Sequence, residues 1–385
     1  MALIYDLILK NGEVLDPAQN LREKRDVAFK DGKVAAISDN IPSVHGDQVI
    51  DVAGKLVVPG LIDIHGHFAY KILPYRANPD QTNLTVGVTT AVDAGSTGWM
   101  NFPAFRSYVI ERVDTRLLAF LHLSSIATMS VVMGIPDLED FRFAKADETI
   151  KCIEENRDLI LGVKVRLSPN GTTMKNAVPA MSMARQIADR TNTHIMVHVM
   201  ESPISLQKVF EYLEPGDIVT HIFHSDTHSI LDERNQIRPE VWNAYERGII
   251  FDTGCCMRHF SIPVCQLAIK EGLLPHALST DRVGNWPYVS RNYNMLEIMS
   301  MFLAMGMSLE QVIRGVTSGA AAAINREDLG TLRVGSVGDA AVLELEDGHF
   351  AYEDTLGSEI ASGLRFAHVL TIRAGTRWRP QLISA

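Results

Sequence analysis

Residues 57–67 read VVPGLIDIHGH, a short apolar run that ends in two histidines. Its β-branched and aliphatic side chains, bounded by glycines, predict a buried strand. Because residues two apart in a strand point to the same side, the imidazoles of His65 and His67 share one face. Neutral imidazole is a good ligand for Zn²⁺. The run therefore predicts a metal site at the end of a strand. The alternative is that two histidines without a shared function happen to lie at a strand end.

Seven further runs of this kind follow, and longer stretches with helical character, such as residues 177–192, separate several of them. The candidate strands are residues 61–67, 89–95, 116–124, 162–168, 194–200, 217–224, 249–254 and 277–283. Alternation of strand and helix predicts an α/β fold with a parallel sheet, and eight such units predict a closed (β/α)₈ TIM barrel. Enzymes of this architecture keep their sites at the carboxyl ends of the strands, which is where the two histidines lie.

The two ends of the chain have a different texture. Residues 1–58 consist of short strand-like runs with tight-turn dipeptides at Asn11-Gly12 and Asp31-Gly32, and strand-like runs return after residue 330. Chain termini often lie close together in a domain. We therefore predict a small β-sandwich domain built from residues 1–58 with 331–385, and a barrel domain over residues 59–330.

Composition limits the class of protein. The 385 residues are 46% hydrophobic and 21% charged, with a net charge of −10, which argues against nucleic acid as the main partner. The four cysteines match no zinc-ribbon or redox spacing, and the N-terminus lacks the features of a signal peptide. No apolar run is long enough to span a bilayer. We expect a cytoplasmic protein that acts on a small molecule and forms a homo-oligomer, without a membrane partner.

The opening run resembles the first-strand motif of the amidohydrolase superfamily, Pro-Gly-x-Ile-Asp-x-His-x-His. Every fixed position is matched, at Pro59, Gly60, Ile62, Asp63, His65 and His67. The resemblance extends to GVTTAVDAGS (87–96) as the second strand, VTSGAAAAIN (316–325) as the closing helix and GSVGDAAVLE (335–344) as a C-terminal β-segment. It covers nearly the whole chain, and it implies a metal-dependent hydrolase.

The family pattern implies four further metal ligands, all found in the right order: Lys164, His198, His221 and Asp281. An unpaired lysine inside a barrel strand is costly, so the resemblance implies that CO₂ converts Lys164 into an anionic carbamate. The alternative is a lysine at a strand end whose amine reaches solvent. In the implied arrangement, His65, His67 and Asp281 hold the more buried ion, His198 and His221 hold the second, and the carbamate bridges both.

The implied cofactor is a pair of divalent ions, with Zn²⁺ as the default for these ligands. Two such ions bring four positive charges, and the carbamate, Asp281 and a bridging hydroxide remove three of them. The remaining charge suits a developing oxyanion. The implied mechanism is attack of the metal-bridging hydroxide on an amide or ester carbonyl, with Asp281 acting as general base and then general acid.

Substrate-binding residues are less clearly marked. Arg166 lies two residues past Lys164 and shares its inward face, where it binds a substrate carboxylate or pairs with the anionic ligands. Other candidates follow the strand ends, where loops build the pocket: Tyr70, Arg258, Asn285, Trp286 and Tyr288. His259 and Arg282 also follow strands, but such residues are more often surface or structural ones.

Residues that are typical of other subfamilies and absent from this chain limit the range of expected substrates. Dihydroorotases usually carry an arginine soon after His-x-His, whereas the run here is HGHFAYK (residues 65–71). Mononuclear D-aminoacylases replace the bridging lysine with cysteine. The chain most resembles a smaller group of binuclear amidohydrolases described as deacetylases or dihydroorotase-like proteins. The resemblance implies deacetylation of an N-acetyl amino acid or an O-acetyl 2-hydroxy acid.

Three alternatives remain open. The chain could be a cyclic amide hydrolase, dihydroorotase-like or hydantoinase-like. It could be a deaminase with one metal, a class that uses a glutamate on strand five; Glu201 lies near that place, but Lys164 favours the binuclear form. It could also be a catalytically inactive barrel that acts as an interaction protein, against which the complete ligand set argues. One metal ion per chain would indicate the deaminase, none would indicate the interaction protein, and two would indicate a binuclear hydrolase.

Overall fold

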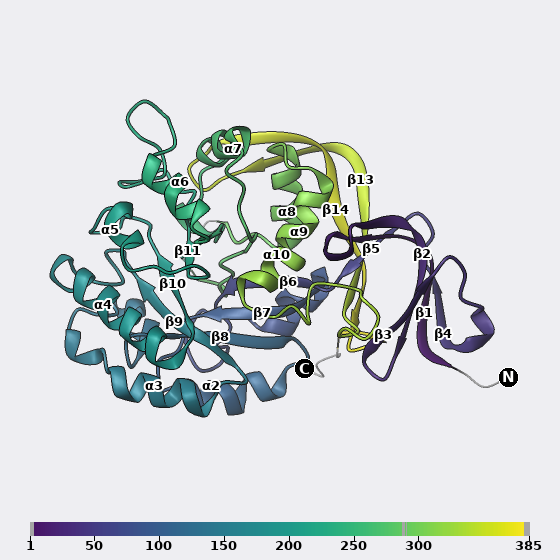
Figure 1. Ribbon diagram of the computed structural model, residues 1–385, viewed down its shortest axis with the longest axis horizontal. Coiled ribbons are helices and arrows are strands. Elements are labelled where there is room, and N and C mark those ends of the chain that lie inside the picture. The colour runs from purple at the N-terminus through teal and green to yellow at the C-terminus, as the bar shows by residue number, and fades with distance from the viewer. Residues whose placement is uncertain (1–3, 287–288, 290, 381–385) are drawn as a thin grey trace.

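The computed structural model describes residues 4–286, 289 and 291–380 (Figure 1). The centre of the molecule is a parallel sheet of seven strands. In spatial order these are β6 (Leu61–Gly66), β7 (Val88–Ala94), β8 (Arg116–His122), β9 (Ile160–Arg166), β10 (His194–His198), β11 (Ile218–Thr220) and β12 (Ile250–Asp252). Spatial order follows chain order without exception, as expected for successive strand–helix units that turn in one direction.

Helices follow most of the strands and lie outside the sheet (Figure 1). They are α1 (Pro79–Thr82), α2 (Phe102–Tyr108), α3 (Ala146–Glu155), α4 (Met174–Thr191), α5 (Leu206–Phe210), α6 (Pro239–Glu246), α7 (Ile262–Glu271), α8 (Met295–Ala304), α9 (Leu309–Gly315) and α10 (Ser318–Ala323). The helix predicted over residues 177–192 is present as α4. It buries Ala177, Ala180, Met181 and Ala184, whose spacing forms one apolar stripe. No helix in the described part of the chain combines the length and apolar character needed to cross a membrane.

The eighth predicted strand, residues 277–283, is not a regular strand. Ala277 makes one parallel bridge with Asp252 at the end of β12, and Arg282 makes another with Gly66 at the end of β6. Between them Asp281 adopts φ 50°, in the left-handed region. A residue in that conformation cannot continue an extended ladder, so the segment touches both edges of the sheet without pairing along either.

The ends of the chain join a second, mixed sheet of eight strands. In spatial order they are β15 (Thr376–Arg377), β14 (Glu359–Arg373), β13 (Ala340–Glu353), β5 (Leu56–Pro59), β1 (Tyr5–Asp16), β2 (Leu21–Lys30) and β3 (Lys33–Ser38), with β4 (Gly46–Asp51) also paired to β1. The C-terminal β13 pairs antiparallel with β5, from Leu343 opposite Leu56 to Ala340 opposite Pro59. Through this pairing the described strands from both ends of the chain form one hydrogen-bonded sheet, and the predicted sandwich stays a prediction.

The hairpin of β13 and β14 extends past this sheet toward α7 and α8 (Figure 1). The backbone N–H of Phe366 on β14 donates to Ser300 Oγ of α8 at 2.9 Å. At the hairpin's end, Asp354 Oδ2 accepts from the backbone N–H of Ile262, the first residue of α7, at 2.8 Å. The C-terminal segment therefore contacts barrel helices as well as the N-terminal strands. The division into two domains stays a prediction.

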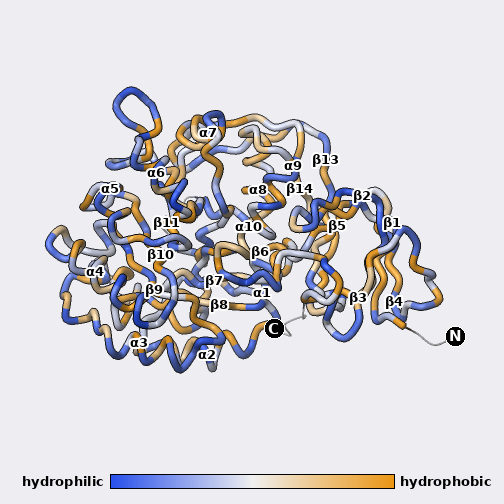
Figure 2. Tube along the Cα trace, viewed as in Figure 1, coloured by the Kyte–Doolittle hydropathy of each residue, from blue (hydrophilic) through white to orange (hydrophobic). Residues whose placement is uncertain are grey.

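The apolar core sets the position of the site. Figure 2 shows hydrophobic stretches in strands of both sheets, whereas the loop beside α6 is hydrophilic. Leu118, Phe120 and Met196 belong to a buried cluster shared with α10. Because residues two apart in a strand share a face, His122 and His198 follow Phe120 and Met196 on that face. The histidines therefore lie on top of an apolar core, at the carboxyl ends of the strands.

One buried carboxylate ties the two ends of the chain together. Asp16 is fully buried; its Oδ2 accepts from Thr331 Oγ1 at 2.9 Å and from the backbone N–H of Leu332 at 2.7 Å. Replacing it by alanine leaves these donors buried without an acceptor. We expect Asp16→Ala to lower the free energy of unfolding by about 2–4 kcal/mol, measured from urea unfolding curves. Asp47→Ala, at an exposed position, serves as control and should change it by less than about 0.5 kcal/mol. Equal unfolding midpoints for the two variants would contradict this role of Asp16.

Candidate metal centre

A cavity of about 680 Å³ opens at the carboxyl ends of the parallel strands. Its lining includes most of the residues predicted from the sequence: His65, His67, Lys164, Arg166, His198, Asp281 and Trp286. Cavities of this size bind small molecules.

Asp281 lies at the centre of the cluster. One ligand atom each of His65, His221 and Asp281 lies within 4.8 Å of the other two. Asp281 Oδ1 is 3.4 Å from His65 Nε2 and 3.2 Å from His67 Nε2. An aspartate oxygen and imidazole nitrogens that converge in this way are the donor set that Zn²⁺ prefers.

The second part of the cluster is a group of three imidazoles. The ring of His221 lies 4.3 Å from that of His198 and 4.2 Å from that of His259, measured between centroids. Nε2 of His198 and Nε2 of His221 are buried and have no hydrogen-bond partner among the described residues. Buried polar atoms are nearly always satisfied. A metal ion is the partner that would satisfy both nitrogens, so the residues present fit the group that their chemistry implies.

Hydrogen bonds to the other ring nitrogen orient two of these ligands. Thr220 Oγ1 donates its proton to Asp252 Oδ2 at 2.7 Å, so it accepts from His65 Nδ1, which is 2.7 Å away. His221 Nδ1 donates to the carbonyl of Gly254 at 2.9 Å, since a carbonyl can only accept. In both rings the proton therefore sits on Nδ1, and the lone pair of Nε2 is free to bind a metal.

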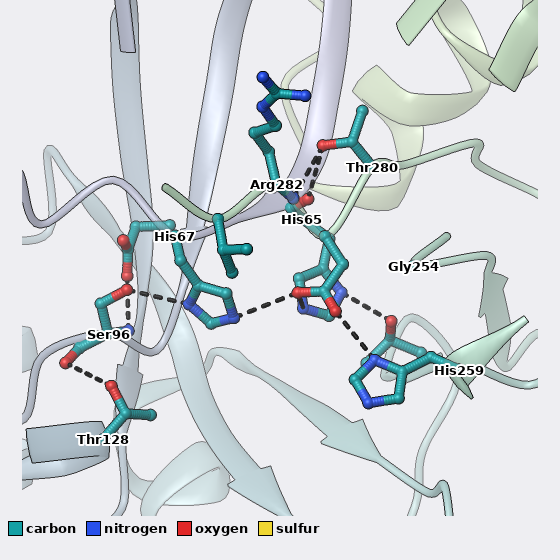
Figure 3. A network of polar contacts seen from close by, with 12 residues as sticks. His65, His67, Ser96, Thr128, Gly254, His259, Thr280 and Arg282 are labelled. Atoms are coloured by element: carbon teal, nitrogen blue, oxygen red, sulfur yellow. Dashed lines mark hydrogen bonds and ion pairs between the residues drawn. The ribbon is translucent and has the colours of Figure 1, made fainter. Parts of the chain in front are cut away.

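The side chains of His67 and Ser96 also contact each other. His67 Nδ1 is 2.9 Å from Ser96 Oγ, and Thr128 Oγ1 donates to the Ser96 carbonyl at 3.4 Å (Figure 3). The backbone N–H of Ser96 in turn donates to Asp93 Oδ1 at 2.7 Å. A residue on the loop after β7 therefore supports a ligand that directly follows β6.

Burial sets the protonation of the cluster. It lowers the pKa of His65, His198 and His221 well below the ordinary value, which favours the neutral imidazole that binds metal. Burial also lowers the pKa of Lys164 to about 7, so the neutral amine is well populated near neutral pH. Burial alone would raise the pKa of Asp281, but the neighbouring imidazoles, His65 foremost, hold it well below its usual value. Asp281 is therefore a carboxylate.

Two residues of the cluster have strained backbones. His221 adopts φ 63° and Asp281 adopts φ 50°, in the left-handed region that non-glycine residues rarely enter. Each follows directly on the extended segment that carries it. Such conformations cost of order 1–3 kcal/mol each and cluster at functional sites. The strain turns both side chains toward the same point.

Gly95 makes room for Lys164. It adopts φ 87°, and a Cβ atom on it would lie 2.7 Å from Lys164 Cγ and 2.8 Å from Lys164 Cβ. We therefore expect Gly95→Ala to displace the lysine and to weaken metal binding about 10- to 100-fold, measured by elemental analysis after dialysis against graded chelator. Gly335→Ala is the matched control, because Gly335 has φ 91° but nothing within 4 Å of its added Cβ. Equal metal retention in the two variants would contradict the expectation.

The remaining predicted substrate residues do not all reach the cavity. Arg166 lines it, but its Nη1 donates to Asp137 Oδ2 at 2.8 Å. Trp286 lines it and stacks on Tyr75, with ring centroids 5.8 Å apart. The Arg258 side chain is 62% exposed, pairs with Asp226 and does not line the cavity. Tyr70 and the exposed Asn285 do not line it either, and Tyr288 lies outside the described residues.

Two residues that lie at the site were not assigned to it from the sequence. His259, expected at the surface or in a structural role, is buried with its Nδ1 2.9 Å from Asp281 Oδ2 (Figure 3). Arg76, nine residues past His67, is buried and lines the cavity. Both lie in irregular loops, where no periodic pattern shows the direction of a side chain.

Comparisons with known proteins find relatives over most of the chain. A profile of the amidohydrolase family matches residues 56–234 and 261–370. A deacetylase of Agrobacterium fabrum is 34% identical over 334 residues, which are 85% of this chain and 80% of that protein. Proteins of this family generally use divalent metals.

Two solved structures resemble the whole chain. One is described as an adenine deaminase, with a TM-score of 0.89, 26% identity, and coverage of 98% of this chain and 100% of that one. The other is described as a dihydroorotase, with a TM-score of 0.85, 31% identity, and coverage of 97% and 99%. The fold is therefore of the TIM-barrel type found in these proteins.

Proposed function

This chain belongs to the amidohydrolase family and is a hydrolytic enzyme, and we propose that its buried histidine cluster holds two divalent ions, most simply Zn²⁺, for deacetylation of a small acylated acid. The observation that carries the proposal is the pair of buried, unpartnered Nε2 atoms of His198 and His221 beside the carboxylate of Asp281. In our assignment His65, His67 and Asp281 hold one ion. His198 and His221 hold the other.

Lys164, as a carbamate, would be a further ligand of the ions. Its neutral amine adds to the carbon of CO₂ and releases one proton, which leaves an anionic N-carboxylate. Nζ lies 3.5 Å from His65 Nε2, and the lysine has no ion pair among the described residues. The low pKa of the buried amine supports the reaction, because only the unprotonated form adds to CO₂. The anion would offset the positive charge of the metals.

The ions, when bound, would lower the pKa of a water molecule and polarise the substrate carbonyl. The protein's part is proton transfer and orientation. Asp281 accepts the proton of the attacking water and passes it to the leaving amine or alkoxide. His259 contacts Asp281 Oδ2 and so holds the carboxylate with Oδ1 toward His65 and His67.

The proposed substrates are N-acetyl amino acids and O-acetyl 2-hydroxy acids. Support comes from the relatives described as deacetylases, at 26–34% identity, and from the arginines that line the cavity. Cyclic amide hydrolysis is the second candidate, because the solved dihydroorotase is 31% identical over nearly the whole chain.

The test begins with metal content of freshly purified protein, followed by assays of acetate release. We expect about two ions per chain and turnover of acetylated acids. The same preparation is assayed with dihydroorotate, hydantoin and adenine. Turnover of one of these alone would replace the deacetylase assignment. Absence of metal, even after reconstitution with bicarbonate and Zn²⁺, would overturn the mechanism and favour an interaction protein.

Two structural details belong to the same proposal. We propose that residues 277–282, which bridge β12 and β6, take the place of an eighth strand and close the barrel. This closure would bring Asp281 opposite His65. We also keep the expectation of a cytoplasmic homo-oligomer. Light scattering of the purified protein would measure its oligomeric state.

A further inference from the structure

Arg76 is a buried cation that forms no ion pair with any residue in the described part of the chain. Its residue exposure is 6%, and it lines the cavity of the metal centre. Nε and Nη1 have no hydrogen-bond partner among the described residues, and no carboxylate of those residues forms an ion pair with it. Leaving a buried charged donor unsatisfied is expensive. A ligand that fills the cavity would remove this cost if it brought an acceptor to the guanidinium.

The guanidinium is nevertheless held in place. Its Nη2 donates to Thr128 Oγ1 at 2.6 Å, and its Cζ lies over the ring of Trp286, 5.8 Å from the centroid. Thr128 is in turn linked through Ser96 to His67 (Figure 3). The same polar chain therefore positions a metal ligand at one end and Arg76 at the other. An arginine oriented in advance loses less conformational entropy when it binds an anion.

The nearest acidic residues are already engaged. Asp93, Asp137 and Asp281 attract Arg76 electrostatically, yet each accepts hydrogen bonds from other groups. Asp93 accepts from the backbone N–H groups of Phe68 and Ser96, both at 2.7 Å. Burial outweighs these attractions and lowers the pKa of Arg76 to about 10. The arginine thus remains charged at neutral pH while its charge is unmatched.

Arg166 differs from Arg76 in this respect. Its Nη1 donates to Asp137 Oδ2 at 2.8 Å, and His122 Nε2 lies 3.3 Å from the same oxygen. His122 Nδ1 accepts from the backbone N–H of Ser124, so its proton is on Nε2 and faces Asp137. Arg166 therefore already has a carboxylate partner, whereas Arg76 does not.

We propose that Arg76 is the specificity-determining residue of this site and that it binds the carboxylate of the acylated acid, an inference that rests on the proposed deacetylase function. The guanidinium supplies charge-assisted N–H donors to the carboxylate. The acyl group then faces the histidine cluster. Arg166, neutralised by Asp137, is not the principal carboxylate anchor.

The test compares substrates that differ only in the carboxylate. N-acetylleucine is paired with N-(3-methylbutyl)acetamide, and O-acetyl-lactate with ethyl acetate, all with the metal-loaded enzyme. In Arg76→Gln we expect kcat/KM to fall about 10- to 100-fold for the two acids, mainly through KM. The neutral counterparts should change by less than about threefold. Arg234→Gln, an exposed arginine outside the cavity, should leave all four rates unchanged.

A second, milder variant tests the proposal in case Arg76→Gln does not fold. Thr128→Val removes the hydroxyl that holds Nη2 and keeps the guanidinium. We expect about a threefold to tenfold loss on the acids alone, compared with the wild type at equal metal content. Equal losses on an acid and its neutral counterpart, or no loss on the acids, in the variants that retain metal would overturn the proposal.

A binding measurement separates this inference from the proposed reaction. Calorimetry compares 4-methylpentanoate with 4-methylpentanamide on wild-type holoenzyme and on Arg76→Gln. Tighter binding of the carboxylate, lost by about tenfold or more in the variant, supports the role of Arg76 even if no acetylated substrate is hydrolysed. Equal binding of the two probes by the wild type, or equal carboxylate affinity in both proteins, overturns it even if deacetylation is found.

Discussion

Lys164→Ala is expected to reduce metal content from about two ions per chain to one or none and to lower kcat at least about 1000-fold. The lysine is fully buried in the cluster and forms no ion pair with a carboxylate of the described residues, so alanine leaves a void where the proposed carbamate would supply negative charge. Without that anion, two divalent ions would sit among neutral imidazoles and a single aspartate. Their mutual repulsion would then be poorly offset.

Elemental analysis and steady-state kinetics measure this effect together. Lys151→Ala is the matched control, because Lys151 is 75% exposed and pairs with Glu155 four residues away on the surface. A short carboxylic acid added to Lys164→Ala should restore part of the metal binding, since it can occupy the void and replace the missing anion. Two tightly held ions in Lys164→Ala, without any additive, would rule out a bridging role for this residue.

Asp281→Asn is expected to lower kcat about 10²- to 10⁴-fold, the range typical for loss of a general base. The amide has the same shape, but it cannot take up the proton of the attacking water. Since the surrounding imidazoles hold the pKa of Asp281 well below its usual value, the wild-type residue stays ionised from mildly acid to neutral pH. The ratio of wild-type to variant kcat should therefore stay constant over that range.

The kinetics of Asp281→Asn are interpreted only alongside its metal content, because Asp281 also belongs to the proposed ligand set. Asp226→Asn serves as control, since Asp226 pairs with the exposed Arg258 outside the cavity. Near-normal kcat in a metal-loaded Asp281→Asn enzyme would show that another group moves the proton. His259, which contacts Asp281, would be the next residue to test.

Much of the architecture was readable from local patterns. The alternating apolar runs predicted all seven strands of the parallel sheet, with boundaries that differ by a few residues. The segment predicted as the eighth strand bridges both edges of the sheet through single residues only. Asp281 in this segment has a left-handed backbone, and its side chain contacts His65, His67 and His259. No nearby residue in the sequence signals such a turn.

The convergence of the candidate ligands was also predictable, because parallel strands in successive order present their carboxyl ends at one edge. His65, Lys164 and His198 lie near strand ends, so topology alone brings them together. The positions of the substrate-binding residues were harder to predict from the sequence. Arg258 follows a strand as closely as His259 does, yet it points to solvent while His259 is buried against Asp281. Adjacent positions in an irregular loop have no fixed period that separates inside from outside.

The sequence by itself determined the class of fold, the family and the order of the candidate metal ligands, since each depends on short motifs and on the two-residue period of strands. Only the tertiary structure decided which loop residues enter the cavity and which arginine lacks a counterion. Arg76 is buried because Thr128 and Trp286 hold it, and Arg166 is neutralised because Asp137 reaches it from another loop. Such contacts join residues far apart in the chain, and their energies appear only once the chain has folded.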